Sequence, residues 1–548
     1  MMKKYLLIAS LLFNTPVSAE PVEWPSYGGD LGQSRYVNDA SINTENVSHL
    51  KLKWMFQTGI VGSFENTPIV KDGVMYVTTP YNHLYALNAR NGERLWRYKH
   101  KLGTTIYCCG PNSKGAAIAG NLVIMATLDA MLVAIDKDTG KLVWETTIAD
   151  SEQGYSETGA PIIYQDKIII GVAGAEYGIR GFISAYDLKT GALLWRWHTI
   201  PEPDQVQPDG TKGWTGIFTE KADGINDLHR DIAAEKAAIA SGEFDNAWEH
   251  GGGSSWMPVT IDTATGHIYA TIGNPAPDLD GSLRPGDNRW SASMVSLDSQ
   301  TGKMIWGYQY LPHDVWDLDA ASPPILTTAK DKQDKDIAVA VHAGKTGWVY
   351  VHDRKTGDLI RRSDPMVEHK NLFVKPTPGK GTEMLPGANG GVNWSPGAVD
   401  PRTHHVFYSN LHQPMHYEVR SVPWRKGRLW LGGAFKVIPG EKQSGNVSAV
   451  NLDSGKINWQ YTTDQPMIGG TLATAGNLLF SGESNGYFFA LDSRTGKKLW
   501  QFQAGAGVNA APMAYRIDGK LHIAVAAGGN AQINAPRGGT VAVFTIEK

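Results

Sequence analysis

The chain has 548 residues and a formal net charge of −3 at pH 7, so it offers no basic footprint for a nucleic-acid partner. Its 61 glycines and 18 tryptophans, with few long amphipathic runs, favour one large all-β body rich in turns. They argue against the several domains that the length alone would suggest.

The first predicted element is an N-terminal targeting segment. Two lysines precede an apolar run from Tyr5 to Phe13, and small residues lead up to Ala19. This pattern predicts a signal peptide over residues 1–19 and a single mature domain over residues 20–548, exported to the periplasm. An uncleaved anchor is the alternative. Because neither this run nor any later segment is long enough to span a bilayer, we expect a soluble protein without a membrane anchor.

A repeat runs along the rest of the chain. Each copy has an Asp or Asn, then a Gly after a Thr, Ser or Asn, then a short apolar run that ends in Trp. Each predicts a strand, a tight turn and a strand, with the Asp capping its turn, Gly at positive φ and Trp between neighbouring units. The spacing is typical of four-stranded propeller blades of about 40–50 residues. Clear copies begin at Asn88, Asp136, Asp187, Asp298, Asn451 and Asp492, and weaker copies at Asp262, Asp353 and Asp400.

We expect seven to nine of these units, with eight preferred, and hence an all-β, eight-bladed β-propeller with tryptophan-docking repeats. Trp54 belongs to an incomplete first copy, and Val541 to Ile546 is a plausible strand to close the ring with it. Residues 201–249 break the rhythm and are predicted to be a partly helical insertion, with a helix over 225–240. A separate small domain is the alternative, weakened by the shortage of apolar residues for a core.

The two cysteines, Cys108 and Cys109, are adjacent. In an oxidising compartment neighbouring thiols tend to pair. Their Cα atoms would be about 3.8 Å apart, closer than in ordinary disulfides, so the bond would form a strained ring of a kind that tends to lie at functional sites. A pair of free thiols is the alternative.

The segment from His313 to Asp319 carries two carboxylates. If it is extended, Asp317 and Asp319 point to one face, and Trp316 and Leu318 point to the other. Two carboxylates on one face repel unless a cation lies between them, and a hard metal ion with oxygen ligands would resolve that repulsion. An acidic surface loop with nothing bound is the alternative.

Loops between the repeats carry further residues with chemistry. Glycine-rich turns precede a carboxylate and a tryptophan, an Asn-Pro-Ala-Pro run delivers an amide, and a Gly-Lys-Thr run supplies a cation. Each is a weak signal alone. They are Gly174-Ala175-Glu176, Gly251 to Trp256, Gly273 to Pro277, Gly344-Lys345-Thr346 and Asn393-Trp394.

Taken together, these residues resemble the pyrroloquinoline quinone (PQQ)-dependent alcohol dehydrogenases, including the methanol dehydrogenases. The resemblance runs from Trp24 to near the C-terminus. Its most specific markers are Cys108-Cys109, Gly174-Ala175-Glu176, Gly273 to Pro277 and Trp316-Asp317. It implies an eight-bladed propeller, in agreement with the spacing of the repeat.

The resemblance implies a role for each matching residue. The quinone would lie between Trp256 and the ring of Cys108-Cys109, with Asp317 as catalytic base and Lys345 at the reactive oxygens of the quinone. Lys114 stands where the family usually has Arg, so it keeps the charge but loses the bidentate fork. The metal ligands would be Glu176, Asn274, Asp317 and Asp319, and the cofactor would further be lined by Glu65, Lys114, Thr158, Ala173, Gly174, Ala175, Ser254, Asn393 and Trp394.

Asp319 bears on the identity of the metal. Within the family, calcium enzymes have a small or neutral residue there and lanthanide-dependent enzymes have Asp. Three carboxylates also suit a trivalent hard ion better than a divalent one. We therefore expect one lanthanide(III) ion, with Ca²⁺ as the alternative.

Two further departures concern the substrate. Asp278 and Ile468 stand where the family often has aromatic residues, which indicates a wider or more polar mouth than a methanol enzyme has. The expected reaction is oxidation of primary, larger alcohols, with a sugar or polyol dehydrogenase and a non-catalytic propeller scaffold as alternatives. Because there is no Cys-x-x-Cys-His for haem, electrons are expected to pass to a soluble cytochrome c. A homodimer is a further expectation.

Overall fold

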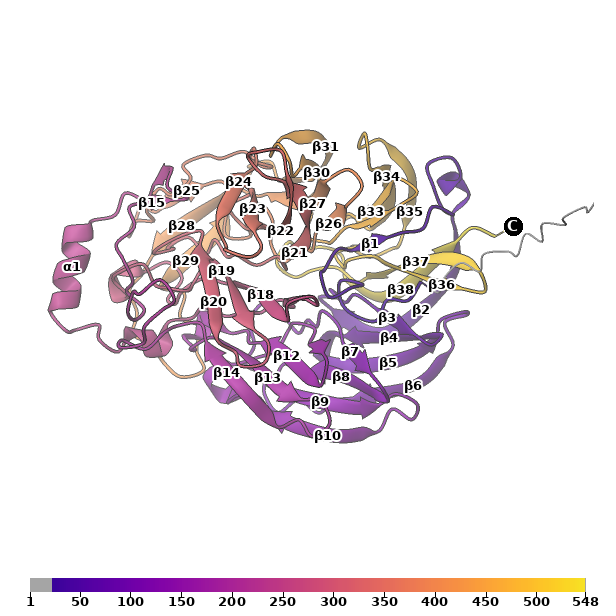
Figure 1. Cartoon of the computed structure of the whole chain (residues 1–548), viewed down its shortest axis with the longest axis horizontal. Coiled ribbons are helices and arrows are strands. Elements are labelled where there is room, and N and C mark those ends of the chain that lie inside the picture. The colour runs from indigo at the N-terminus through magenta and orange to yellow at the C-terminus, as the bar shows by residue number, and fades with distance from the viewer. Residues whose placement is uncertain (1–21, 548) are drawn as a thin grey trace, which may run out of the picture.

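The computed structural model describes residues 22–547, so the predicted signal peptide lies outside the described residues. Between these limits the chain is almost all β-strand with one α-helix, which confirms the all-β prediction. Figure 1 shows the sheets following one another around the molecule in chain order. Within the same residues, none of the helices is both long and apolar enough to cross a membrane.

Most sheets contain four antiparallel strands. The first three sheets along the chain are β3 (Ile69–Lys71), β4 (Val74–Thr79), β5 (His83–Asn88) and β6 (Arg94–Lys99); β7 (Ala117–Ala119), β8 (Leu122–Ala126), β9 (Met131–Asp136) and β10 (Leu142–Thr147); and β11 (Ile162–Tyr164), β12 (Lys167–Gly171), β13 (Phe182–Asp187) and β14 (Leu193–His198). The next two are β17 (Thr260–Asp262), β18 (His267–Ile272), β19 (Ser293–Asp298) and β20 (Met304–Gln309); and β21 (Ile325–Lys330), β22 (Asp336–Ala343), β23 (Val349–Asp353) and β24 (Leu359–Arg362).

The C-terminal part adds three more large sheets and one extra hairpin. The sheets are β26 (Ala398–Asp400), β27 (His405–His412), β30 (Ser444–Asn451) and β31 (Ile457–Thr463); β32 (Leu472–Thr474), β33 (Leu478–Gly482), β34 (Tyr487–Asp492) and β35 (Lys498–Gln503), with β1 (Tyr36–Val37) parallel to β32; and β36 (Met513–Ile517), β37 (Lys520–Ala527), β38 (Gly538–Thr545) and β2 (Lys51–Gly62). The hairpin of β28 (Met415–Val419) and β29 (Gly433–Val437) pairs with β25 (Thr382–Met384). Short 3₁₀ turns are η1 (Val47–His49), η2 (Pro80–Asn82), η3 (Ser151–Gln153), η4 (Ala175–Tyr177), η5 (Ala247–His250) and η6 (Gly281–Leu283).

The repeat has the predicted turn chemistry. In the β9–β10 turn, Asp136 Oδ1 accepts hydrogen bonds from the Thr139 amide at 2.8 Å and hydroxyl at 2.7 Å. Gly140 has φ +70°, and a Cβ there would lie 2.7 Å from the ring of Trp96, so the turn needs glycine for its conformation and for space. The indole of Trp96 also donates to Lys137 O at 2.9 Å. Equivalent Trp–Gly contacts join Trp54 to Gly92, Trp144 to Gly191, Trp195 to Gly302, Trp306 to Gly357 and Trp459 to Gly496.

The strand that carries Trp54 and the last strand of the chain share one sheet. β2 pairs antiparallel with β38, with Trp54 opposite Val543, which confirms the predicted pairing of the C-terminal strand with the Trp54 strand. Trp500 Nε1 donates to Leu50 O at 3.0 Å, so the last tryptophan docks on the first repeat. Buried apolar side chains fill the spaces between neighbouring sheets, as where Leu132 and Ala134 pack with Ile168 and Ile170.

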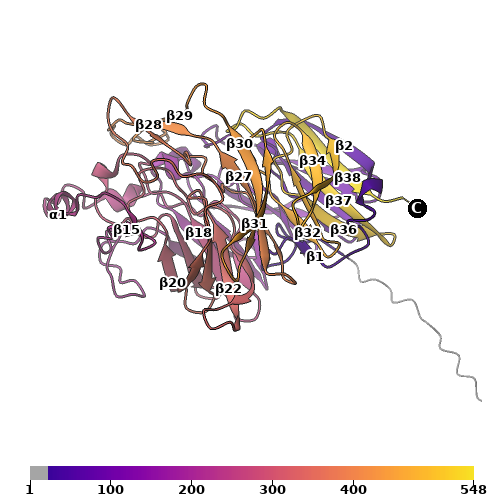
Figure 2. The ribbon, with the colours of Figure 1, turned by 90° about the horizontal axis from the view of Figure 1, so that it is seen from above.

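The insertion has a shorter helix than the sequence predicted. Helix α1 (Ile232–Ala240) begins after Asp231, whose side chain accepts from the Ala234 amide at 3.0 Å. The predicted start at residue 225 is wrong, because Asn226–Asp227 forms β16 and pairs with β15 (Lys221–Ala222). Figures 1 and 2 both show α1 at the end of the molecule opposite to β36 and β37.

Two buried histidines on neighbouring strands should make the fold sensitive to acid. Burial lowers the pKa of His342 to about 3 and that of His352 to about 4. Because an unfolded histidine has a pKa of about 6.5, their stabilising effect is complete above that pH and is lost as the pH falls toward 4. Each should lower the free energy of unfolding by about 2 kcal/mol at pH 5.

Urea unfolding between pH 7.5 and pH 4.5 measures this loss. The free energy of unfolding of the His352→Gln variant should depend less steeply on pH than that of the wild type. The difference in slope should correspond to about one proton fewer taken up on unfolding. A free energy of unfolding that is constant over this range would contradict the assignment.

Candidate functional site

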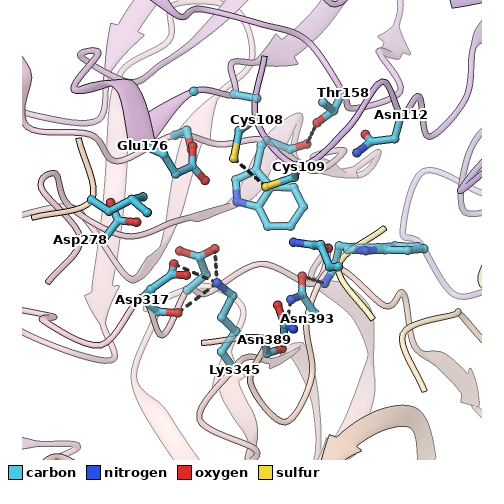
Figure 3. A pocket seen from close by; sticks show the side chains of 18 of the residues that line it. Cys108, Cys109, Asn112, Thr158, Glu176, Asp278, Asp317, Lys345, Asn389 and Asn393 are labelled. Carbon is cyan, nitrogen blue, oxygen red and sulfur yellow. Dashed lines mark hydrogen bonds and ion pairs between the residues drawn. The ribbon is translucent and has the colours of Figure 1, made fainter. Parts of the chain in front are cut away.

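A cavity of about 420 Å³ opens among loops that lie far apart in the sequence. It gathers nearly all of the residues that the sequence marked as candidates, and Figure 3 shows several of them facing one space. Those that line it are Glu65, Cys108, Cys109, Lys114, Thr158, Ala173, Gly174, Glu176, Ser254, Trp256, Asp317, Asp319, Lys345, Asn393 and Trp394. Ala175 and Asn274 do not line it.

Lys345 joins the two aspartates. Its Nζ lies 2.9 Å from Asp317 Oδ1, 3.0 Å from the Asp317 carbonyl oxygen and 3.1 Å from Asp319 Oδ2. All three side chains are buried, so the alternative of an acidic surface loop is wrong. The ammonium group of Lys345 thus holds the carboxylates of Asp317 and Asp319 beside the cavity.

The backbone around Asp317 is not the extended strand considered from the sequence. Asp317 has φ +59°, and the segment lies outside the strands. Asp314 organises the loop, because its carboxylate accepts the amides of Trp316 and Leu318, each at 2.9 Å. Trp316 and Leu318 pack into the core, so the two faces of the segment still separate apolar from acidic side chains.

Burial and a surplus of acid govern the charges. Burial alone would lower the pKa of Lys345, but the Asp317 and Asp319 carboxylates outweigh it and raise that pKa well above the usual range. Burial raises the pKa of Glu176 and, more strongly, that of Asp317, and Asp319 adds to both increases. The cavity thus holds more carboxylates than Lys345 can neutralise, which favours binding of a further cation.

Glycine allows Glu176 to reach the cavity. Gly174 has φ +115°, and a Cβ there would lie 2.2 Å from Gly154 O, so only glycine fits this close approach. The turn η4 follows and places Glu176 beside the cysteine pair: ligand atoms of Cys108, Cys109 and Glu176 lie within 4.8 Å of one another.

No S–S bond joins Cys108 and Cys109 in the structure, although their sulfur atoms lie only 2.7 Å apart. Cys109 has φ +62°, which turns the backbone sharply at the pair. The disulfide predicted from the sequence therefore stays a prediction.

The chain is similar to known proteins over most of its length. The family model described as "PQQ: glucose/ethanol/alcohol dehydrogenase, beta-propeller domain" matches residues 24–222, 230–363 and 440–523. A quinoprotein ethanol dehydrogenase of Pseudomonas putida is 32% identical, with 95% of this chain and 90% of the relative covered. The chain belongs to the PQQ-dependent alcohol dehydrogenase family.

Two methanol dehydrogenases are also similar to this chain. Methanol dehydrogenase (cytochrome c) subunit 1 of Methylobacterium organophilum is 32% identical, over 92% of this chain and 83% of its own. The solved structure of a europium-containing methanol dehydrogenase superposes with a TM-score of 0.84 at 28% identity, covering 96% of this chain and 99% of its own.

The cavity fits the PQQ of this enzyme family. PQQ is a flat quinone with three carboxylates, so it needs apolar faces and cationic or hydrogen-bonding edges. Lys114 Nζ lies 5.4 Å from the ring centre of Trp256 and 5.0 Å from that of Trp394, and pairs with Glu65 at 2.8 Å. The buried Ser156 hydroxyl and Trp394 Nε1 have no hydrogen-bond partner within residues 22–547, so both can bond a ligand.

The donor set also fits the metal ion expected for the family. Glu176, Asp317 and Asp319 offer hard oxygen ligands. Among the described residues, however, only Cys108, Cys109 and Glu176 form a set of potential ligands within 4.8 Å. The carboxylates of Glu176, Asp317 and Asp319 do not all lie within 4.8 Å of one another, so they would have to converge to share one ion.

Asn274 contacts Asp319 and is not among the residues that line the cavity, so its role as a metal ligand stays a prediction. Its main-chain amide donates to Asp319 Oδ1 at 2.5 Å, and its side-chain nitrogen Nδ2 donates to Pro275 O at 3.2 Å. Here Asn274 positions Asp319 and does not line the cavity.

Other residues of the cavity escaped the sequence analysis. Asn112, Ser156, Asn389 and Gln532 line it, as does an apolar group around the hairpin β28–β29. The hairpin lies outside the tryptophan repeat, and its alternating pattern alone does not show which face it covers. The apolar group comprises Met415, Leu429, Leu431, Phe435 and Val437, with Lys436 beside it.

Proposed function

We propose that this protein oxidises primary alcohols to aldehydes, with PQQ as electron acceptor and Asp317 as the base. The observation that carries the proposal is the buried ion pair of Asp317 and Lys345 in a cavity with two indoles and the cysteine pair. Asp278 lines the cavity where the family often has an aromatic residue, which supports alcohols larger than methanol as substrates.

A few side chains of the cavity would have defined roles in this reaction. Bound PQQ supplies a two-electron acceptor, and the metal ion supplies Lewis acidity. Asp317 takes the proton of the substrate hydroxyl on its carboxylate. Lys345 orients that carboxylate through Oδ1 and the main-chain oxygen, and it adds positive charge beside the reacting atoms. Trp256 and Cys108-Cys109 would hold the two faces of the quinone.

We propose a lanthanide(III) ion held by Glu176, Asp317 and Asp319, with Asn274 supporting the set and Ca²⁺ as the alternative. The surplus of buried carboxylates supports a trivalent ion, since each additional negative charge favours the higher cation charge. A nearby cation also lowers the pKa of a carboxylate, which would keep Asp317 ready to accept a proton.

The sequence also supports proposals on the domain, the location and the electron acceptor of the protein. We propose that the eight large sheets are the eight blades of one propeller domain over residues 20–548, with the insertion on one face. The predicted signal peptide supports export to the periplasm and cleavage after Ala19. The proposed acceptor is a soluble cytochrome c; a cytochrome c is also part of the name of the Methylobacterium organophilum relative.

The direct test is reconstitution of the purified mature protein with PQQ and either La³⁺ or Ca²⁺. We expect a quinone absorbance band that stays with the protein on desalting, and dye-linked oxidation of ethanol and 1-butanol. Retained quinone without oxidation of any primary alcohol would reject the substrate class. Absence of retained quinone with either metal would reject the function as a whole.

A further inference from the structure

Asp278 is a buried carboxylate that the proposed reaction does not use. It is 1% exposed, lines the cavity, and neither of its Oδ atoms has a hydrogen-bond partner in the part of the chain that the structure describes. Figure 3 shows it facing the same space as Glu176 and Asp317. A buried polar group without a partner is destabilising, so this carboxylate is suited to bond a molecule that enters the cavity.

The main chain holds Asp278 in place. Arg284 donates to Asp278 O at 3.2 Å and to Pro277 O at 2.9 Å, and the Leu279 amide donates to Leu431 O at 2.9 Å. The Arg284 guanidinium therefore binds the backbone and leaves the Asp278 side chain without a counter-ion. The main chain around Asp278 is thus held by hydrogen bonds, and the carboxylate lines the cavity.

The surroundings select a neutral, hydroxyl-bearing ligand. Lys345 and a bound metal ion would place positive charge in the same space, which disfavours a second cation such as an ammonium group. A hydroxyl group bonds the side chain in either protonation state, because a carboxylate accepts and a carboxylic acid can also donate. Leu429, Leu431 and Phe435 line the cavity as well, and they offer contact for a short hydrocarbon chain.

We propose that Asp278 binds the second hydroxyl of a 1,2-alkanediol whose primary hydroxyl lies at Asp317. The proposal rests on the proposed function and narrows its substrate class. Asp278 is then a specificity-determining residue, since it would form a hydrogen bond with a hydroxyl on the carbon next to the reacting one.

Holoenzyme loaded with PQQ and La³⁺ provides the test, with 1,2-butanediol and 1-butanol as matched substrates. We expect kcat/KM for the diol to exceed that for 1-butanol by at least about 10-fold, because a site built to bond a hydroxyl discriminates against the analogue without it. Asp278→Leu, of similar size, should reduce this ratio at least about 10-fold, and Asp278→Asn should reduce it less.

Asp280→Asn is the matched control. Asp280 lies in the same loop, caps Ser282 through Oδ1 at 3.1 Å and does not line the cavity. Its variant should keep the wild-type ratio.

Three outcomes would overturn the proposal: a wild-type ratio near one, an Asp278→Leu ratio equal to that of the wild type, or a ratio lowered equally by Asp280→Asn.

The remaining alternative is that Asp278 binds the metal ion, and a titration of La³⁺ followed by quinone absorbance tests it. A 10-fold weaker metal affinity in Asp278→Leu with an unchanged ratio would make Asp278 a metal ligand and refute the diol contact. The wild-type ratio decides even if a variant does not fold. If the wild type retains no quinone, the proposed function itself fails, and that failure is recognised before any ratio is measured.

Discussion

Asp317→Asn should lower kcat for ethanol oxidation by about 10³-fold while PQQ remains bound, because positioned bases contribute about 10²- to 10⁴-fold. Asparagine keeps the size of the side chain and an oxygen that can accept from Lys345, which lies 2.9 Å from Oδ1. It loses the ability to take a proton from the alcohol. Steady-state kinetics with saturating PQQ and La³⁺ measure the effect, and quinone absorbance after desalting confirms that the cofactor is retained.

Asp334→Asn is the control for this variant. Asp334 is a surface residue that does not line the cavity, and its carboxylate is 87% exposed. Its variant should match the wild type. An Asp317→Asn enzyme with more than a tenth of wild-type kcat would show that another group accepts the proton.

Asp319→Ser should change the metal that the protein uses. The substitution removes one of the three carboxylates proposed to bind the metal, and also the acceptor of the Asn274 main-chain amide, whose nitrogen lies 2.5 Å from Asp319 Oδ1. Since second-shell changes alone weaken metal affinity by about 10- to 100-fold, loss of a direct ligand should weaken La³⁺ affinity by about 100-fold or more. The loss should be smaller for Ca²⁺, because a divalent ion gains less from the third negative charge.

Titrations of La³⁺ and Ca²⁺ against the quinone absorbance measure both affinities in wild type and variant. Asp319→Asn is the matched comparison, since it keeps an oxygen donor and removes only the charge. Equal loss of affinity for the two ions would show that Asp319 does not select between them by charge.

The repeating part of the fold was predictable because its physics is local. A turn such as Asp136 to Gly140 contains its own capping acceptor and its own positive-φ glycine. The residues of the turn therefore determine its conformation, and the sequence pattern is enough to predict it. The tryptophan after each turn packs on the next unit, which made the pairing of β2 with β38 foreseeable too. The start of α1 was predicted too early, because residues 226–227 pair with β15 and the helix begins only after its cap at Asp231.

The site was predictable in its residues and less so in its geometry. Glu176, Asp317 and Lys345 were found by type and resemblance, and the structure brings them to one cavity. The left-handed turn at Asp317 depends on Asp314 accepting two amides, and no pattern of period two or 3.6 encodes such a loop. The hydrogen bond from Asn274 to Asp319 likewise depends on contacts between distant loops.

The central claim is that one cavity holds PQQ and a metal ion beside Asp317. A crystal structure of the protein loaded with PQQ and La³⁺, with anomalous data collected for lanthanum, tests it most directly. We expect one strong anomalous peak within about 2.8 Å of carboxylate oxygens of Glu176 and Asp317, with the quinone stacked on Trp256. A lanthanum peak and quinone density elsewhere, with the cavity carboxylates still bound to Lys345 alone, would contradict the claim.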